Sequence, residues 1–130
     1  MFWLQAANVA FFVLHTALCL FNLLGWAHSK TRRLHLVSMG LTALSWFVFG
    51  IWRGWGYCLC TDWHMKVREA MGIRDESRMY VQLLIEKLSG FRLSESATEW
   101  ITGGGFFAAL ALGVGLHLRD RRRAASQRLA

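Results

Sequence analysis

The residues best suited to chemistry in this chain are a histidine within an apolar segment and two cysteines near another histidine. His15 lies in an uncharged run in which polar residues recur every three or four positions. An ionisable side chain inside an apolar segment of membrane length is a functional candidate by default. His15 could ligate a haem or chlorin, relay a proton, or hydrogen-bond a neighbouring helix. The sequence leaves these three alternatives open.

The second candidate is the stretch 56–64, which reads Gly-Tyr-Cys-Leu-Cys-Thr-Asp-Trp-His. Cys58 and Cys60, with His64 four residues on, form a candidate metal-ligand set because thiolates and imidazoles bind zinc. Only three ligands stand together, and no second pair of cysteines follows. The favoured alternative is a buried turn at the lipid boundary, in which the cysteines act as small apolar residues.

Other signatures of catalysis do not occur in the sequence. The glycines at 103–105 lie in an apolar segment rather than between a strand and a helix, so they do not form a phosphate-binding loop. No serine or cysteine can be assigned a neighbouring base from the sequence. We therefore predict that the protein is not an enzyme. The sequence requires no cofactor, although a haem or chlorin on His15 stays compatible with it.

These side chains must be positioned by helices that cross a membrane. The 130-residue chain is 55% hydrophobic, and a spanning helix needs about 20 predominantly apolar residues. The sequence predicts an all-α integral membrane protein forming a single domain over residues 1–130. Its predicted parts are spans over 2–26, 34–52 and 100–118, an outer connection over 54–96, and a basic cytoplasmic tail over 119–130.

Basic residues indicate how the chain lies in the bilayer. The link between the first two spans carries Lys30, Arg32 and Arg33, and the tail carries Arg119, Arg121, Arg122, Arg123 and Arg128. Because short cytoplasmic segments collect Lys and Arg, both are predicted to be inside and the N-terminus outside. The tryptophans then predicted at the outer interface are Trp3, Trp52, Trp55 and Trp100. The net charge of +7 is thus interpreted as a consequence of membrane topology, and no nucleic-acid partner is predicted. The predicted location is the inner (plasma) membrane of a bacterium.

The outer connection is predicted to contain one or two short helices. Thr61 or Asp62 is expected to cap the first, and Gly72 to end it. Arg78 is expected to begin the second, which runs to Leu88 with apolar residues at helical spacing on one face. Both helices are too short and too charged to span, so we expect them to pack across the outer ends of the spans.

Each predicted span carries a stripe of polar or small residues. The stripes contain Gln5, Asn8, Phe12, His15, Cys19 and Asn22; then His35, Ser38, Thr42 and Ser45; then Glu99, Thr102, Gly103, Phe106, Gly113 and His117. Polar groups in lipid need partners, so these stripes are predicted to face one another, with His15 level with Thr42 and Ser45. Gly105, Ala109 and Gly113 add a ridge of small residues that lets another helix, or a partner subunit, approach closely.

Several runs of the sequence resemble a known bacterial membrane family. They are Arg32-Arg-Leu-His-Leu36, Leu41-Thr-Ala-Leu-Ser-Trp-Phe47, Gly54-Trp-Gly-Tyr-Cys58, Thr61-Asp-Trp-His64 and Tyr80-Val-Gln-Leu-Leu-Ile-Glu-Lys-Leu-Ser-Gly90. Together they resemble the domain of unknown function 2784 over nearly the whole chain. The resemblance implies that His15, His35 and Cys58 occupy family-typical places. The family typically has Cys-Pro-Leu-Thr or Cys-Pro-Phe-Thr where this chain has Cys58-Leu-Cys-Thr61, so Cys60 is an addition.

The resemblance brings no function with it, so the function must be argued from the residues. Small size, dense aromatic belts and small-residue ridges predict an accessory or assembly subunit of a larger membrane complex, in contact with lipid and with other membrane protein subunits. One alternative is a redox protein that binds a haem, chlorin or metal through His15 or through Cys58, Cys60 and His64. Another is a small oligomer that conducts protons or solutes along the polar stripes.

Overall fold

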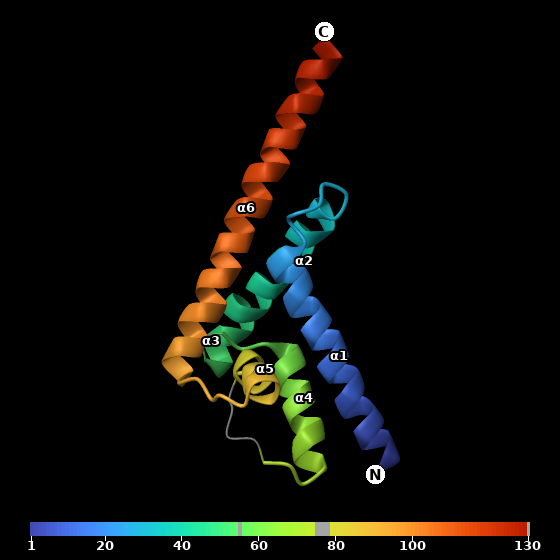
Figure 1. The fold of residues 1–130 in the computed structure, drawn as a ribbon, viewed down its shortest axis with the longest axis vertical. Coiled ribbons are helices and arrows are strands. Elements are labelled where there is room, and N and C mark those ends of the chain that lie inside the picture. Colours follow the sequence, from blue (N-terminus) through green and yellow to red (C-terminus); the bar gives the residue numbers. More distant parts are fainter. Residues whose placement is uncertain (55, 75–78, 130) are drawn as a thin grey trace.

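The computed structural model describes residues 1–54, 56–74 and 79–129. Within these ranges every regular element is a helix, which confirms the predicted all-α class (Figure 1). The elements are α1 (Phe2–Leu24), α2 (Arg32–Leu44), the π-helical segment η1 (Ser45–Phe49), α3 (Gly50–Arg53), α4 (Leu59–Ala70), α5 (Tyr80–Ser89) and α6 (Glu95–Leu129). Trp55, predicted at the outer interface, and Arg78, predicted to begin a helix, lie outside the described residues.

Three stretches of the described chain are long and apolar enough to cross a membrane, as predicted: Phe2–Leu24, Arg32–Arg53 and Glu95–Leu129. The first two contain 23 and 22 residues. At a rise of about 1.5 Å per residue each is roughly 33–35 Å long, which suits a hydrocarbon core of about 30 Å. α2, η1 and α3 together make the second span, so its backbone passes through one wide π-helical turn.

The third helix does not end where its apolar sequence ends. α6 has 35 residues and continues from Leu118 through the arginine cluster to Leu129. Arg, Ala, Gln and Leu are strong helix formers, and no glycine or proline follows Gly115, so nothing local stops the helix at the membrane surface. Figure 1 shows this basic extension projecting beyond the rest of the molecule.

His35 is the point at which the three spans meet. Its side chain is fully buried, and its Nε2 lies 2.9 Å from the carbonyl oxygen of Asn22 in α1. A Cβ added at Gly113 of α6 would lie 2.9 Å from His35 Nδ1, and one added at Gly25 would lie 3.0 Å from His35 Cδ2. The imidazole therefore fits between two positions where only glycine leaves enough room.

The polar stripes of the first two spans face each other, as predicted. Asn22 Nδ2 donates to Thr42 Oγ1 at 2.9 Å, and Ser38 Oγ donates to Asn22 Oδ1 at 2.6 Å. The predicted depth of His15 is wrong, because Thr42 is paired with Asn22, seven residues or about 10 Å further along α1 than His15. The hydrogen bonds around Asn22 thus set the register of α1 against α2.

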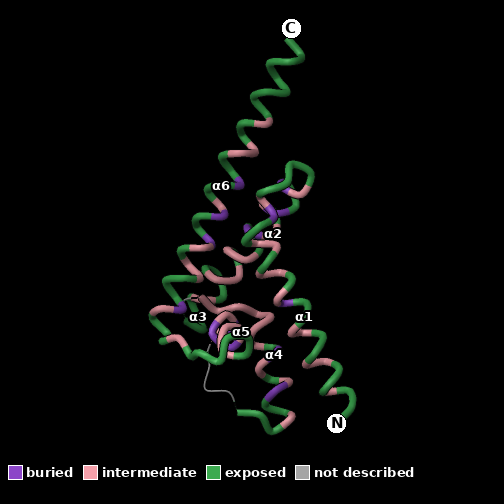
Figure 2. Tube along the Cα trace, in the orientation of Figure 1, coloured by how far each residue is buried: buried purple, intermediate pink, exposed green. Residues whose placement is uncertain are grey.

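An ion pair joins the basic ends of α2 and α6. Arg32 is buried, its Nη1 donates to the Asp120 carboxylate, and its Nε donates to the carbonyl oxygen of Trp26 at 3.0 Å. Between this pair and the outer helices, Met39, Phe106 and Ala109 form the buried apolar core. Figure 2 shows that buried positions are few and lie on the facing sides of the helices, whereas the outward sides are exposed.

The two short helices of the outer connection lie at the end of the molecule that holds the N-terminus (Figure 1). α4 runs beside the N-terminal half of α1, and α5 packs near the start of α6. The predicted cap was wrong, because α4 begins at Leu59 after the extended residue Cys58 (φ −116°, ψ 123°). Asp62 lies inside the first turn, where Lys66 Nζ is 2.7 Å from its carboxylate. Gly72 and Gly90, with φ near +75°, follow the ends of the two helices.

Candidate functional site

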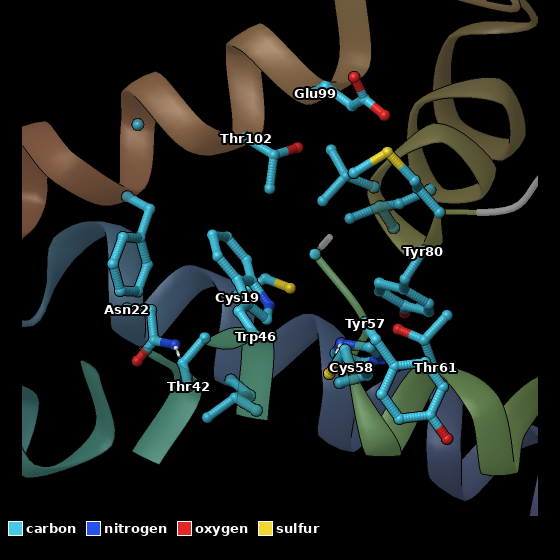
Figure 3. A pocket seen from close by; sticks show the side chains of 18 of the residues that line it. Cys19, Asn22, Thr42, Trp46, Tyr57, Cys58, Thr61, Tyr80, Glu99 and Thr102 are labelled. Carbon is cyan, nitrogen blue, oxygen red and sulfur yellow. Dashed lines mark hydrogen bonds between the residues drawn. The ribbon is translucent and has the colours of Figure 1, made fainter. Parts of the chain in front are cut away.

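A cavity of about 790 Å³ opens between α1, α6 and the outer helices. Asn22 and Thr42 lie at one end of it, and Glu99 and Tyr57 lie at the other (Figure 3). The side chains that line it are mostly apolar, with a few polar groups at defined places. This volume lies within the range of about 300–1,000 Å³ that is usual for small-molecule sites.

His15 forms part of the cavity wall and packs against residues far from it in the sequence. Its ring stacks on that of Tyr80, with centroids 3.8 Å apart and an interplanar angle of 14°. Its Nε2 lies 3.9 Å from Cys58 Sγ, which is a weak contact. Its Nδ1 is buried and has no hydrogen-bond partner among the described residues. α1, α4 and α5 therefore converge on this one imidazole.

Tyr80 holds α5 against α1 through its hydroxyl group. The hydroxyl donates to the carbonyl oxygen of Phe12 at 2.8 Å and lies 2.7 Å from Thr16 Oγ1. Burial raises the pKa of this phenol, so it stays protonated and able to donate. In the sequence, the signal that marks Tyr80 is its position in the run 80–90 that resembles the family.

We expect Tyr80→Phe to lower the free energy of unfolding by about 1–2 kcal/mol, because it removes both hydroxyl contacts and leaves the ring stack in place. Thermal unfolding in detergent, followed by circular dichroism, measures this change. In a Thr16→Val background, Tyr80→Phe should lower the free energy of unfolding by less, since the Tyr80 and Thr16 hydroxyls contact each other. An equal loss of stability in both backgrounds would contradict coupling between the two hydroxyls.

His64 is buried in a second polar group, between α4 and α1. Its Nε2 lies 2.9 Å from Asn8 Oδ1, to which Arg68 Nη1 also donates at 3.4 Å. Phe11 stacks on the imidazole, with centroids 5.8 Å apart. These contacts fix the face that α4 presents to α1. They also pair Asn8, which belongs to the predicted polar stripe, with His64 and Arg68, which lie outside the spans.

The candidate metal set is not assembled in the described part of the chain. There, no group of three or more His, Cys, Asp or Glu side chains is arranged to hold a metal ion. Of the three predicted ligands, Cys58 contacts His15, whereas His64 contacts Asn8. The physical reason is that α4 binds α1 through His64, which takes this ring away from the cysteines. All three cysteines are free.

The Cys60 thiol is poorly suited to act as a thiolate. Burial raises the pKa of the Cys60 thiol, and the neighbouring Cys58 raises it further. A neutral thiol is a weak nucleophile and a weak metal ligand.

His15 does not fit the role of a haem or chlorin ligand in this arrangement. One face of its ring is covered by Tyr80, and Cys58 lies beside the Nε2 atom that would bind the iron. His35 is enclosed between Gly25 and Gly113. An axial bond to His15 would require Cys58 to move, so we derive no cofactor chemistry from it.

The predicted ridge of small residues lies on the inner side of α6. Ala109 and Gly113 are buried, and Gly113 is the contact point for His35. A Cβ added at Gly105 would lie 3.7 Å from Leu23 Cδ1 of α1. In this structure the ridge therefore packs against the other two spans of the same chain.

The family described as Protein of Unknown function (DUF2784) matches residues 5–118, which is most of the chain. The chain belongs to the DUF2784 family. The match confirms the resemblance expected from the sequence. No curated protein and no solved structure matches the chain.

The family pattern expected from the sequence has proline after the cysteine of this turn. In this DUF2784 protein Leu59 takes that place and is the first residue of α4. Proline is favoured at the first position of a helix because that residue's N–H has no partner within the helix. The extended backbone of Cys58 is also the conformation that a following proline would favour. The turn is therefore compatible with the family pattern although this chain lacks the proline.

Proposed function

We propose that this DUF2784 protein is a non-catalytic accessory subunit of a larger complex in the inner (plasma) membrane of a bacterium, with its N-terminus outside. The basic link after α1 and the arginine-rich end of α6 lie at the same end of the molecule (Figure 1). Since cytoplasmic segments collect Lys and Arg, this common position supports a cytoplasmic C-terminus.

A non-catalytic role is supported by the geometry around His15. A nucleophile and its base lie about 2.6–3.2 Å apart, and a third group orients the base. Cys58 Sγ is 3.9 Å from His15 Nε2, and His15 Nδ1 has no partner in the described residues to orient it. The pair is therefore better described as packing in a cavity wall than as an activated thiol.

The observation that carries the accessory role is a second stripe of small residues, on the outward side of α6. Gly104, Ala108, Ala111 and Gly115 are all exposed and lie on one helical face. A Cβ added at Gly104 or Gly115 would meet no atom of the described residues within 4 Å. Glycine within a helix lowers stability by about 0.5–1 kcal/mol relative to alanine, and the packing of the described residues does not explain why glycine is present at these two positions. Close approach by a helix of a partner subunit would explain it.

Co-purification of a tagged chain from its native membrane in mild detergent tests this role. We expect the wild-type chain to elute in a complex larger than the monomer. Gly104→Leu should reduce the yield of partner roughly tenfold, the equivalent of about 1.4 kcal/mol. Gly103→Leu is the matched control, because Gly103 lies beside the stripe and an added Cβ there also meets no atom of the described residues within 4 Å. A wild-type chain that elutes only as a monomer, or equal loss in both variants, would contradict the proposal.

A further inference from the structure

The cavity beside His15 joins a polar rim to an apolar interior. Glu99 of α6 and Arg53 of α3 line the cavity and are exposed, whereas Trp46 is half-buried and Phe106 is buried. Phe106 is seven residues, or about 10 Å, further along α6 than Glu99. The cavity thus runs from the membrane surface into the hydrocarbon region, which is also the direction of a lipid acyl chain in one leaflet.

The charges at the rim have opposite signs and are not paired with each other. Among the described residues no cation pairs with Glu99, which is exposed. Arg53 is also exposed, and its guanidinium carbon lies 5.8 Å from the ring centroid of Tyr57. Two further carboxylates line the cavity: Asp62 is paired with Lys66, and Glu95 is engaged in an interaction of its own. Glu99 and Arg53, which are not paired with each other, therefore match a head group that carries one positive and one negative charge.

Thr102 provides a polar contact one helical turn below the rim. Its Oγ1 is buried and has no hydrogen-bond partner among the described residues. Figure 3 shows Thr102 and Glu99 on the α6 wall of the cavity, opposite Tyr80 and Thr61. A buried hydroxyl without a partner is unfavourable. An ester carbonyl at the junction of a lipid head group and its chain could accept a hydrogen bond from it.

We infer that the cavity binds an amine-bearing zwitterionic phospholipid of the phosphatidylethanolamine type. Arg53 lies where it can contact the phosphate, Glu99 the ammonium group, and Thr102 an ester carbonyl. One acyl chain extends past Leu23 toward Phe106. The surrounding bilayer supplies such a molecule directly, and this inference does not depend on the accessory role proposed above.

Native mass spectrometry of the purified chain tests this inference. The protein is incubated with an equimolar mixture of palmitoyl-oleoyl phosphatidylethanolamine and phosphatidylglycerol, and the retained lipid is identified by its mass. We expect selective retention of phosphatidylethanolamine. Glu99→Gln should weaken its retention about tenfold through loss of a charge-assisted hydrogen bond. Thr102→Val keeps the side-chain shape and should weaken it about fivefold.

Matched glycine variants test whether the lipid occupies this cavity. Gly105 lines the cavity, whereas Gly103 does not, so Gly105→Leu should abolish retention and Gly103→Leu should preserve it. Circular dichroism checks that each variant keeps its helices, and Thr102→Val serves as the test if Gly105→Leu does not fold. Equal retention of the two lipids, or retention that none of the cavity variants changes, would overturn the inference.

Discussion

Asp120→Ala is expected to lower the free energy of unfolding by about 2–3 kcal/mol. It leaves the guanidinium of Arg32 buried without its carboxylate, since the Arg32 side chain is only 5% exposed. Removing one partner of a fully buried ion pair costs about 3–5 kcal/mol. We expect a smaller loss because the Asp120 side chain is 36% exposed and because Arg32 keeps its hydrogen bond to Trp26. Reversible unfolding in mixed detergent micelles measures the change.

Two further variants show whether the loss of stability comes from the broken ion pair or from the change in net charge. Asp120→Glu keeps a carboxylate and should recover much of the stability. Arg32→Met removes the charge that Asp120→Ala leaves uncompensated, so the double variant should be more stable than Asp120→Ala alone. If the two substitutions are simply additive, the pair does not stabilise the contact between α2 and α6.

Gly113→Ala is expected to destabilise the protein by about 1–3 kcal/mol through overpacking. The new methyl group would lie 2.9 Å from His35 Nδ1 and 3.2 Å from Leu36 Cδ2. The imidazole cannot move away easily, because Asn22 holds its Nε2 and Gly25 lies on its other side. The same unfolding measurement in mixed micelles detects the loss.

Gly115→Ala is the matched control on the same helix. A methyl group there would meet no atom within 4 Å, so we expect a gain of about 0.5–1 kcal/mol from helix propensity alone. The difference between the two variants isolates the contact with His35. If Gly113→Ala behaves like Gly115→Ala, the three spans do not pack around this histidine.

The sequence by itself determined the three membrane spans and the faces that the first two spans turn toward each other. Apolar runs of membrane length predicted three spans, because a helix in lipid must satisfy its own backbone and expose apolar side chains. The spacing of Ser38, Thr42 and Asn22 predicted that the first two spans face each other, since polar groups in lipid need partners. These are local properties, set by residues three or four positions apart.

The end of α6 could not be predicted in the same way. The charges that begin after Leu118 predict the end of the span there, but the helix continues to Leu129. Charge decides where a helix leaves the membrane, whereas backbone propensity decides where it ends. The two limits coincide only when a glycine or proline lies at the surface, and none does here.

Only the tertiary structure decided which side chains form the candidate site. Cys58 and His64 are neighbours in sequence, yet one contacts His15 and the other contacts Asn8. Tyr80 reaches His15 from 65 positions away, and Thr102 and Glu99 come from a third helix. Helical spacing fixes the face on which a residue lies but not the partner opposite it. The partner depends on the register and tilt of whole helices, which here are set by His35 between two glycines and by the hydrogen bonds of Asn22.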